Sequence, residues 1–195
     1  MDCSGVAATF AGTPIVAVVG WKNSGKTTLA TSLVAELTSR GYRVATVKHA
    51  HHGFAVDTGT TDSARHRRAG AAQVAVVADT RWALMTERPH AGKSTLFTVL
   101  AHLEPADVIV LEGFKAAAVP KIEVRRRDAA DQSPLADTDP MVIAIAADHA
   151  VEGAYVPVFN LNDITSLTDF IILALELARG SGSTEDLNQP TRAPQ

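Results

Sequence analysis

A glycine-rich stretch near the amino terminus has the residue types of a phosphate-binding loop. Residues 20–27 read Gly-Trp-Lys-Asn-Ser-Gly-Lys-Thr and match G-x-x-x-x-G-K-[ST] at every fixed position. Gly20 and Gly25 allow the tight turn that aims backbone N–H groups at phosphate oxygens. Lys26 suits the β- and γ-phosphates, and Thr27 suits Mg²⁺. The stretch therefore predicts a nucleoside-triphosphate site.

The segments on either side have the order that such a loop needs. The apolar run 14–19 precedes it, and the helix-forming residues 29–37 follow it. The helix would add the positive end of its dipole to the phosphate site. We predict that the following residues contact the nucleotide: Gly20, Trp21, Lys22, Asn23, Ser24, Gly25, Lys26, Thr27 and Thr28.

A carboxylate ends a second apolar run. Residues 108–111 are Val-Ile-Val-Leu, and Glu112 and Gly113 follow them. Metal chemistry in open α/β sheets gathers at the carboxyl ends of the strands. We predict that Glu112 and Lys26 form the catalytic pair, with Glu112 holding Mg²⁺ through its water shell or orienting an attacking water.

The densest polar segment follows the strand expected at 42–48. Its titratable residues are His49, His51, His52, Asp57, Asp62, Arg65, His66, Arg67 and Arg68. The segment could be a switch in which an aspartate reaches Mg²⁺ and an arginine meets phosphate oxygens. It could instead bind an anionic second ligand, hold a transition metal through its imidazoles, or be an ordinary solvated loop.

We assign residues of this segment to two roles. Asp62 joins Thr27 and Glu112 as a candidate Mg²⁺ ligand. The candidates for a second-ligand or switch site are His49, His51, His52, Arg65, Arg68 and Lys115.

The remaining chain alternates β-branched runs with helical segments. This alternation predicts a three-layer α/β domain with a mostly parallel sheet, the P-loop NTPase fold. We expect strands at 15–19, 42–48, 108–111, 121–125, 142–146 and 156–159, and helices at about 26–40, 62–69, 94–103 and 164–178. The runs 73–78 and 81–86 are separated by two residues and predict an antiparallel hairpin at a sheet edge, a plausible dimer surface.

Composition and charge limit the setting of the protein. Its 195 residues suit one sizeable domain over 14–179, with a flexible tail at 1–13 and a disordered tail at 180–195. A net charge of −3 argues against a general nucleic-acid binder. The amino terminus does not resemble a signal peptide, and no apolar run suits a membrane span, so we expect a cytoplasmic protein.

The residues that recognise the base of the nucleotide are the hardest to predict from the sequence. No Asn-Lys-x-Asp motif for guanine occurs in the chain. The loop after the strand at 142–146 should pass near the base, which nominates Asp148 as an acceptor for guanine N–H groups. Asn160, Asn162 and Asp163 are alternatives, and helix capping or turn formation would explain all four residues equally well.

Several blocks of this chain, taken in order, resemble the molybdopterin-guanine dinucleotide biosynthesis adapter (MobB) family. They span about 14–178. The blocks are Gly20 to Thr28, Lys48-His49-x-His51-His52, Asp62-Ser63-x-Arg65-His66-x-x-Ala69-Gly70-Ala71, Arg81-Trp82-Ala83-Leu84, Glu112-Gly113-Phe114-Lys115 and Pro120-Lys121-Ile122-Glu123-Val124. One departure is that residues 57–62 lack the proline that members usually carry there.

The resemblance implies a GTP-binding, Mg²⁺-dependent homodimer with weak intrinsic hydrolysis. Its partner would be the guanylyltransferase that attaches GMP to molybdopterin, and it could assist transfer to molybdoenzymes. Slow turnover also fits the sequence, because none of the available arginines, including 125–127, is identified as a transition-state group. A small-molecule kinase or ATP-dependent ligase of the P-loop class remains the rival interpretation.

Overall fold

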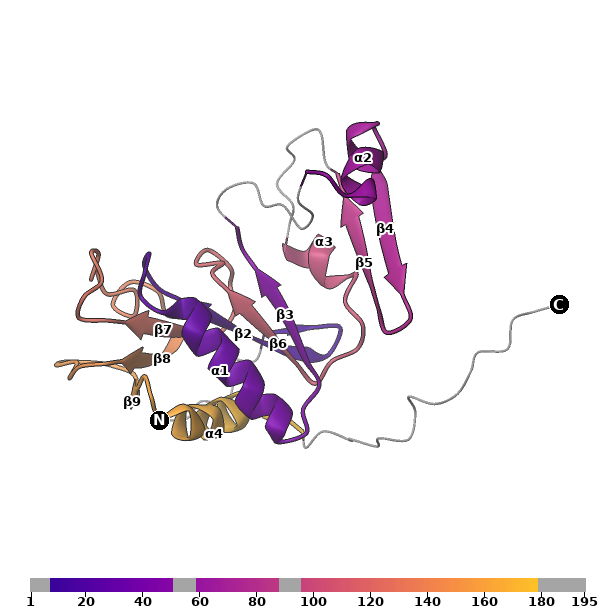
Figure 1. The fold of residues 1–195 in the computed structure, drawn as a ribbon. Helices are drawn as coiled ribbons and strands as arrows, with labels where there is room; N and C mark the ends of the chain where they lie inside the picture. Colours follow the sequence, from indigo (N-terminus) through magenta and orange to yellow (C-terminus); the bar gives the residue numbers. More distant parts are fainter. Residues whose placement is uncertain (1–7, 51–58, 88–95, 179–195) are drawn as a thin grey trace. The chain divides into compact units, whose positions relative to one another are not determined.

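The computed structural model describes residues 8–50, 59–87 and 96–178 (Figure 1). The chain forms two compact units, Met1–His49 with Leu103–Gln195, and Ala50–His102. Along the chain, the smaller unit is an insertion between two segments of the larger one. The domain predicted over 14–179 stays a prediction.

The larger unit is built on a seven-stranded sheet within its described residues. Along the sheet the order is β3-β6-β2-β7-β8-β9, all parallel, and β1 pairs with β2 in the antiparallel sense. Strand β1 lies inside the segment predicted to be a flexible tail. The bounds are β1 Thr9–Phe10, β2 Thr13–Val19, β3 Val44–Lys48, β6 Val108–Glu112, β7 Lys121–Arg125, β8 Val142–Ala147 and β9 Val158–Asn160.

The central strands are apolar because both of their faces are covered. Ile15 to Val19 of β2 and Val108 to Leu111 of β6 are buried without a break, the pattern of a parallel sheet. Their register pairs Val18 with Glu112. Parallel pairing therefore brings the carboxyl ends of β2, β3 and β6 to one edge of the sheet, where the phosphate-binding loop begins.

Two described helices of the larger unit pack against each other, α1 (Lys26–Ser39) and α4 (Ile164–Ala174) (Figure 1). Leu33 and Leu37 of α1 join the core that the sheet buries. The side chain of Asp163 caps α4 by accepting a hydrogen bond from the Ser166 N–H at 3.1 Å. Helix α4 ends before the predicted 178.

The segment 126–141 is tied to a buried polar face of β7. Glu123 is 1% exposed and accepts hydrogen bonds from the backbone N–H groups of Leu135 and Ala136, both at 2.9 Å. Lys121 is 2% exposed and pairs with Asp139 at 2.6 Å. These contacts satisfy two charged groups that would be costly to bury alone.

The smaller unit consists of α2 (Asp62–Arg68), β4 (Gln73–Ala78), β5 (Arg81–Thr86) and α3 (Leu96–Leu100). The hairpin β4–β5 has the predicted bounds, but it forms its own two-stranded sheet rather than an edge of the main one. The side chain of Thr61 caps α2 by accepting a hydrogen bond from the Ala64 N–H.

Within the three described ranges, no helix combines the length and apolar character needed to cross a membrane.

Candidate nucleotide site

The phosphate-binding loop joins β2 to α1, as its sequence predicts. The Lys26 ammonium donates to the Trp21 carbonyl oxygen at 2.5 Å and so spans the loop. The Ser24 N–H donates to the same carbonyl at 3.2 Å, and Leu29 starts the helical ladder by donating to the Gly25 carbonyl at 2.9 Å. These hydrogen bonds define the compact turn of the loop.

Both fixed glycines of the loop have a positive φ, and a side chain at either position would meet a close neighbour. Gly20 has φ +152°, and a Cβ there would lie 2.7 Å from the Val124 carbonyl oxygen of β7. Gly25 has φ +93°, and a Cβ there would lie 2.8 Å from Nε of Arg126. These contacts place the Arg126 side chain against the loop, in a position that the sequence alone did not assign.

Three side chains meet at the end of β6. The Thr27 hydroxyl donates to Oε1 of Glu112 at 2.5 Å. The Lys48 ammonium contacts the same carboxylate oxygen at 2.8 Å and Oγ1 of Thr27 at 3.2 Å. Glu112 is the last residue of β6, and Lys48 is the last residue of β3. The two residues are partners in the register of these parallel strands.

The carboxyl group of Glu112 is held in its ionised form. Partial burial would raise its pKa, but hydrogen bonds from Lys48 and Thr27, with the charges of Lys48 and Lys26, hold the pKa below 4.5. The folded state therefore favours the carboxylate. This contribution to stability is present above pH 4.5 and is lost as the pH falls through the lower pKa of the folded protein.

We expect the variant Glu112→Gln to lose less stability in acid than the wild type. The free energy of unfolding, measured by urea denaturation at about pH 7 and about pH 4, should fall less between the two pH values in the variant. Glu104→Gln, at an exposed position, is the matched control. An equal fall in wild type and Glu112→Gln would contradict the ionised role of Glu112.

Positive charge accumulates around the loop. Burial lowers the pKa of Lys26, and the charges of Lys115 and Lys48 lower it further while Glu112 opposes them. The Lys115 ammonium lies 3.5 Å from the centre of the Trp21 ring, which joins the predicted second-site lysine to the loop itself. The cluster contains three ammonium groups and one carboxylate, so its net charge is positive. A bound polyphosphate would reduce the repulsion between the ammonium groups.

The donor set around Thr27 fits Mg²⁺. A hydroxyl and an ionised carboxylate are hard oxygen ligands, and they converge to 2.5 Å. A cationic group, the Lys48 ammonium, already lies against both oxygens. Thr27 and Glu112 would hold the metal directly or through its waters, and a bound Mg²⁺ would supply charge neutralisation to the phosphates.

The polar segment that follows β3 is only partly within the described residues. The backbone N–H of His49 donates to the Glu112 carbonyl at 2.9 Å, and its ring centre lies 5.0 Å from that of Phe114. His51, His52 and Asp57 lie outside the described residues. No group of three potential ligands for a metal occurs in the part of the chain that the structure describes.

The other candidates of this segment lie in the smaller unit. Arg65 pairs with Asp62 at 3.2 Å on the exposed side of α2, and both line a hollow with His66. Arg68 donates to the Gly59 carbonyl oxygen. Their roles toward Mg²⁺ or a second ligand stay predictions.

The base candidates are engaged in their own loops. Oδ1 of Asp148 accepts from the Arg127 N–H at 3.0 Å and contacts Nδ1 of His149 at 2.8 Å. Asn160 accepts from the Asn162 N–H at 2.8 Å, and Asp163 caps α4. Turn formation and capping thus describe what these side chains do in the structure, and base recognition by them stays a prediction.

Sequence reasoning missed Lys48 as a site residue, although the strand to which it belongs was expected. The signal that identifies it is the register of β3 against β6, which places its ammonium on Glu112. It also missed Arg126, whose position depends on the close approach of β7 to the loop.

A mostly parallel sheet with a phosphate-binding loop between β2 and α1 defines the fold of the P-loop NTPases. The family described as "Molybdopterin guanine dinucleotide synthesis protein B" matches residues 15–148. The chain belongs to this MobB family, as its sequence blocks predict.

Individual relatives agree with this assignment. The molybdopterin-guanine dinucleotide biosynthesis adapter protein of Escherichia coli is 36% identical over 169 residues, which cover 86% of this chain and 96% of that protein. The protein of the same name from Haemophilus influenzae is 35% identical over 158 residues, covering 81% and 87%. A solved MobB homologue from Bacillus stearothermophilus superposes with a TM-score of 0.63 at 27% identity, covering 84% and 99%.

Proposed function

We propose that this chain is the GTP-binding adapter of molybdopterin guanine dinucleotide synthesis. In this role it binds GTP and Mg²⁺, hydrolyses GTP slowly, and presents its GTP-bound form to the guanylyltransferase that attaches GMP to molybdopterin. The names of its relatives support the pathway. The convergence of Thr27, Glu112 and Lys48 beside the phosphate-binding loop is the observation that carries the nucleotide chemistry.

In this proposal, each side chain of the cluster has a different role in binding the triphosphate. Lys26 would leave the Trp21 carbonyl for the β- and γ-phosphate oxygens, while the backbone N–H groups of the loop bind the phosphates from below. Lys48 would give up its place on Thr27 and Glu112 to Mg²⁺, because both cations need the same oxygens. Lys115 adds positive charge from the side of Trp21.

Slow hydrolysis follows from what the site supplies. Glu112 could orient a water, but the same carboxylate would also hold Mg²⁺ together with Thr27. Arginines that stabilise the transition state contribute about 10³ to 10⁵ in rate in related enzymes. The side chain of Arg126 lies against the loop at Gly25, but this position does not by itself put its guanidinium on a γ-phosphate. A partner protein is the proposed accelerator.

The experiment that tests this proposal is a calorimetric titration of the purified chain with GTP and with ATP, with Mg²⁺ and with EDTA. We expect GTP to bind more tightly than ATP, and EDTA to weaken GTP binding. Rapid hydrolysis by the chain alone, or a phosphorylated small-molecule product, would favour the rival kinase or ligase.

Self-association belongs to the same proposal. Val77 and Trp82 are register partners on the hairpin, and they are 77% and 62% exposed. Exposed apolar side chains on a two-stranded sheet are typical of a protein interface. We therefore place the homodimer contact on this hairpin, and a monomer in light scattering at micromolar concentration would contradict it.

A further inference from the structure

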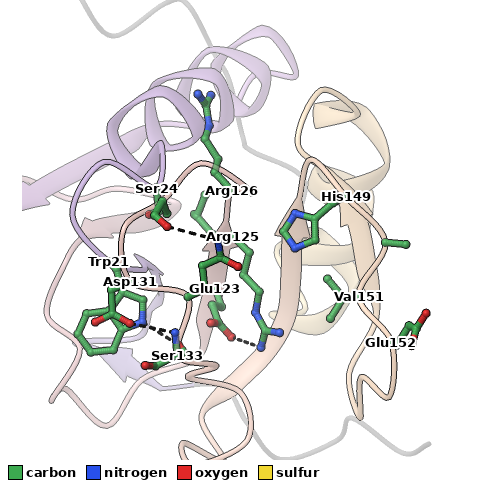
Figure 2. A pocket seen from close by; sticks show the side chains of 14 residues that line it. Trp21, Ser24, Glu123, Arg125, Arg126, Asp131, Ser133, His149, Val151 and Glu152 are labelled. Atoms are coloured by element: carbon green, nitrogen blue, oxygen red, sulfur yellow. Dashed lines mark hydrogen bonds and ion pairs between the residues drawn. The ribbon is translucent and has the colours of Figure 1, made fainter.

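A cavity of about 260 Å³ lies on the β7 side of the phosphate-binding loop (Figure 2). Its walls come from the loop itself, from the end of β7, and from the residues that follow β8. The residues that matter for its chemistry are Trp21, Ser24, Glu123, Arg125 and His149. The loop therefore shares two of its own side chains with this cavity.

Two polar atoms of the lining have no hydrogen-bond partner. They are Oγ of Ser24, a residue that is 1% exposed, and Nε of Arg125. Both atoms are buried. Among the described residues, they are the buried side-chain nitrogen and oxygen atoms that have no hydrogen-bond partner. Buried donors without acceptors are rare in folded proteins, because each costs about 1–3 kcal/mol, and such groups commonly mark a binding site.

The guanidinium of Arg125 is fixed from one side. Its Nη2 donates to Oε2 of Glu123 at 2.8 Å, and Glu123 is itself anchored by the N–H groups of Leu135 and Ala136. Figure 2 shows the Arg125 side chain running between β7 and the segment after β8 toward Glu123. The arginine is thus a rigid donor whose Nε still lacks an acceptor.

His149 faces the same space from the segment after β8 (Figure 2). Its Nδ1 lies 2.8 Å from Oδ1 of Asp148, a carboxylate oxygen that accepts, so Nδ1 carries the proton. In the neutral imidazole, Nε2 is then an acceptor. The cavity combines a fixed donor on one wall with an imidazole on another, whose Nε2 accepts when the ring is neutral.

We infer that this cavity binds the base of the nucleotide and selects guanine over adenine through Arg125. The inference rests on the proposed function, because it assumes that the loop holds the phosphates of the same nucleotide. Trp21 and Ser24 belong both to the loop and to the cavity wall, so the cavity adjoins the phosphate-binding loop. The base lies where the nucleotide leaves the loop toward β7 and β8.

The donor pattern of the cavity matches guanine. Guanine presents two acceptors, O6 and N7, on one edge, and arginine is their commonest partner. Adenine places an amino donor beside N7, which would face the donors of Arg125. On the other side, Nε2 of His149 can accept from a ring N–H of guanine. Asp148, the residue expected to read the base, acts in this arrangement by fixing the tautomer of His149.

The test compares base analogues on the full chain by calorimetry in Mg²⁺. We expect the wild type to bind GDP about 10-fold or more tightly than ADP, and to lose about fivefold or more with 7-deaza-GDP, which lacks N7. Arg125→Lys keeps a cation for Glu123 but loses the planar fork. In this variant the preference for GDP over ADP should fall about 10-fold, and the penalty for 7-deaza-GDP should disappear.

Controls separate base reading from phosphate binding and from folding. Arg127→Lys, at the exposed neighbouring position, should keep the wild-type ratios. Tripolyphosphate should bind all three proteins equally, and the melting midpoint of Arg125→Lys should stay near that of the wild type.

The outcomes that overturn the inference are distinct from those that overturn the proposed function. If tripolyphosphate and GDP bind the wild type but GDP and ADP do so equally, or if Arg125→Lys keeps the wild-type ratios, the cavity does not read the base. If neither tripolyphosphate nor any nucleotide binds, the proposed function and the inference both fail.

Discussion

Replacing Lys26 by alanine should weaken the binding of GTP by at least about 100-fold. The ammonium is the one fixed cation of the loop pattern, and each hydrogen bond to a charged phosphate contributes about 1.5–3 kcal/mol. Two such bonds correspond to about 100-fold or more, since 1.4 kcal/mol is a factor of ten. Calorimetric titration with GTP in excess Mg²⁺ measures the loss.

The same substitution should leave the fold intact. The pKa of Lys26 is lowered by burial and by the neighbouring charges of Lys115 and Lys48, so the cation is not favoured by the fold. Thermal unfolding of Lys26→Ala without nucleotide should therefore match the wild type or exceed it. Arg43→Ala removes an exposed charge from the same unit and should bind GTP normally. Wild-type affinity in Lys26→Ala would remove the loop from the nucleotide site.

Replacing Glu123 by alanine should destabilise the protein more than any other single change considered. The carboxylate is 1% exposed, and it binds two backbone N–H groups and the guanidinium of Arg125. Its loss leaves the partly buried Arg125 cation and two backbone N–H groups without their acceptor, which costs about 3–5 kcal/mol. For a chain of this size that lowers the melting midpoint by roughly 6–20 °C, measurable by calorimetry or circular dichroism.

A matched pair of variants separates burial from charge. Glu104→Ala removes a carboxylate from an exposed position and should stay within about 0.5 kcal/mol of the wild type. Glu123→Gln keeps one acceptor but presents an amide to the second N–H, so its stability should fall between the other two. A melting midpoint of Glu123→Ala equal to that of Glu104→Ala would show that Glu123 does not anchor the segment 126–141.

Local features of the molecule could be predicted from the sequence. The hairpin was predicted with its observed bounds, because alternation and a two-residue connection are properties of neighbouring residues. The loop 20–27 and the position of Glu112 at a strand end followed from equally local patterns. For these features, the types and the order of neighbouring residues were sufficient for a correct prediction.

Features that depend on long-range packing could not be predicted. The role of Lys48 requires the register between β3 and β6, which are far apart in the chain. The alternation Lys-Ile-Glu-Val-Arg of β7 is also typical of a strand with one solvated face, yet Lys121 and Glu123 are buried through contacts with residues 135–139. The division into two units, and the separate sheet of the hairpin, likewise arise from contacts that no local pattern encodes.

The adapter role is tested most directly by the association of this chain with the guanylyltransferase as a function of bound nucleotide. The chain is immobilised, loaded with Mg²⁺ and a nonhydrolysable GTP analogue, with GDP, or with no nucleotide, and the dissociation constant of the enzyme is measured. We predict tightest association in the GTP-analogue state and the same weak association for Lys26→Ala in all three. No association in any state, or equal affinity in every state with wild type and Lys26→Ala alike, would contradict the account.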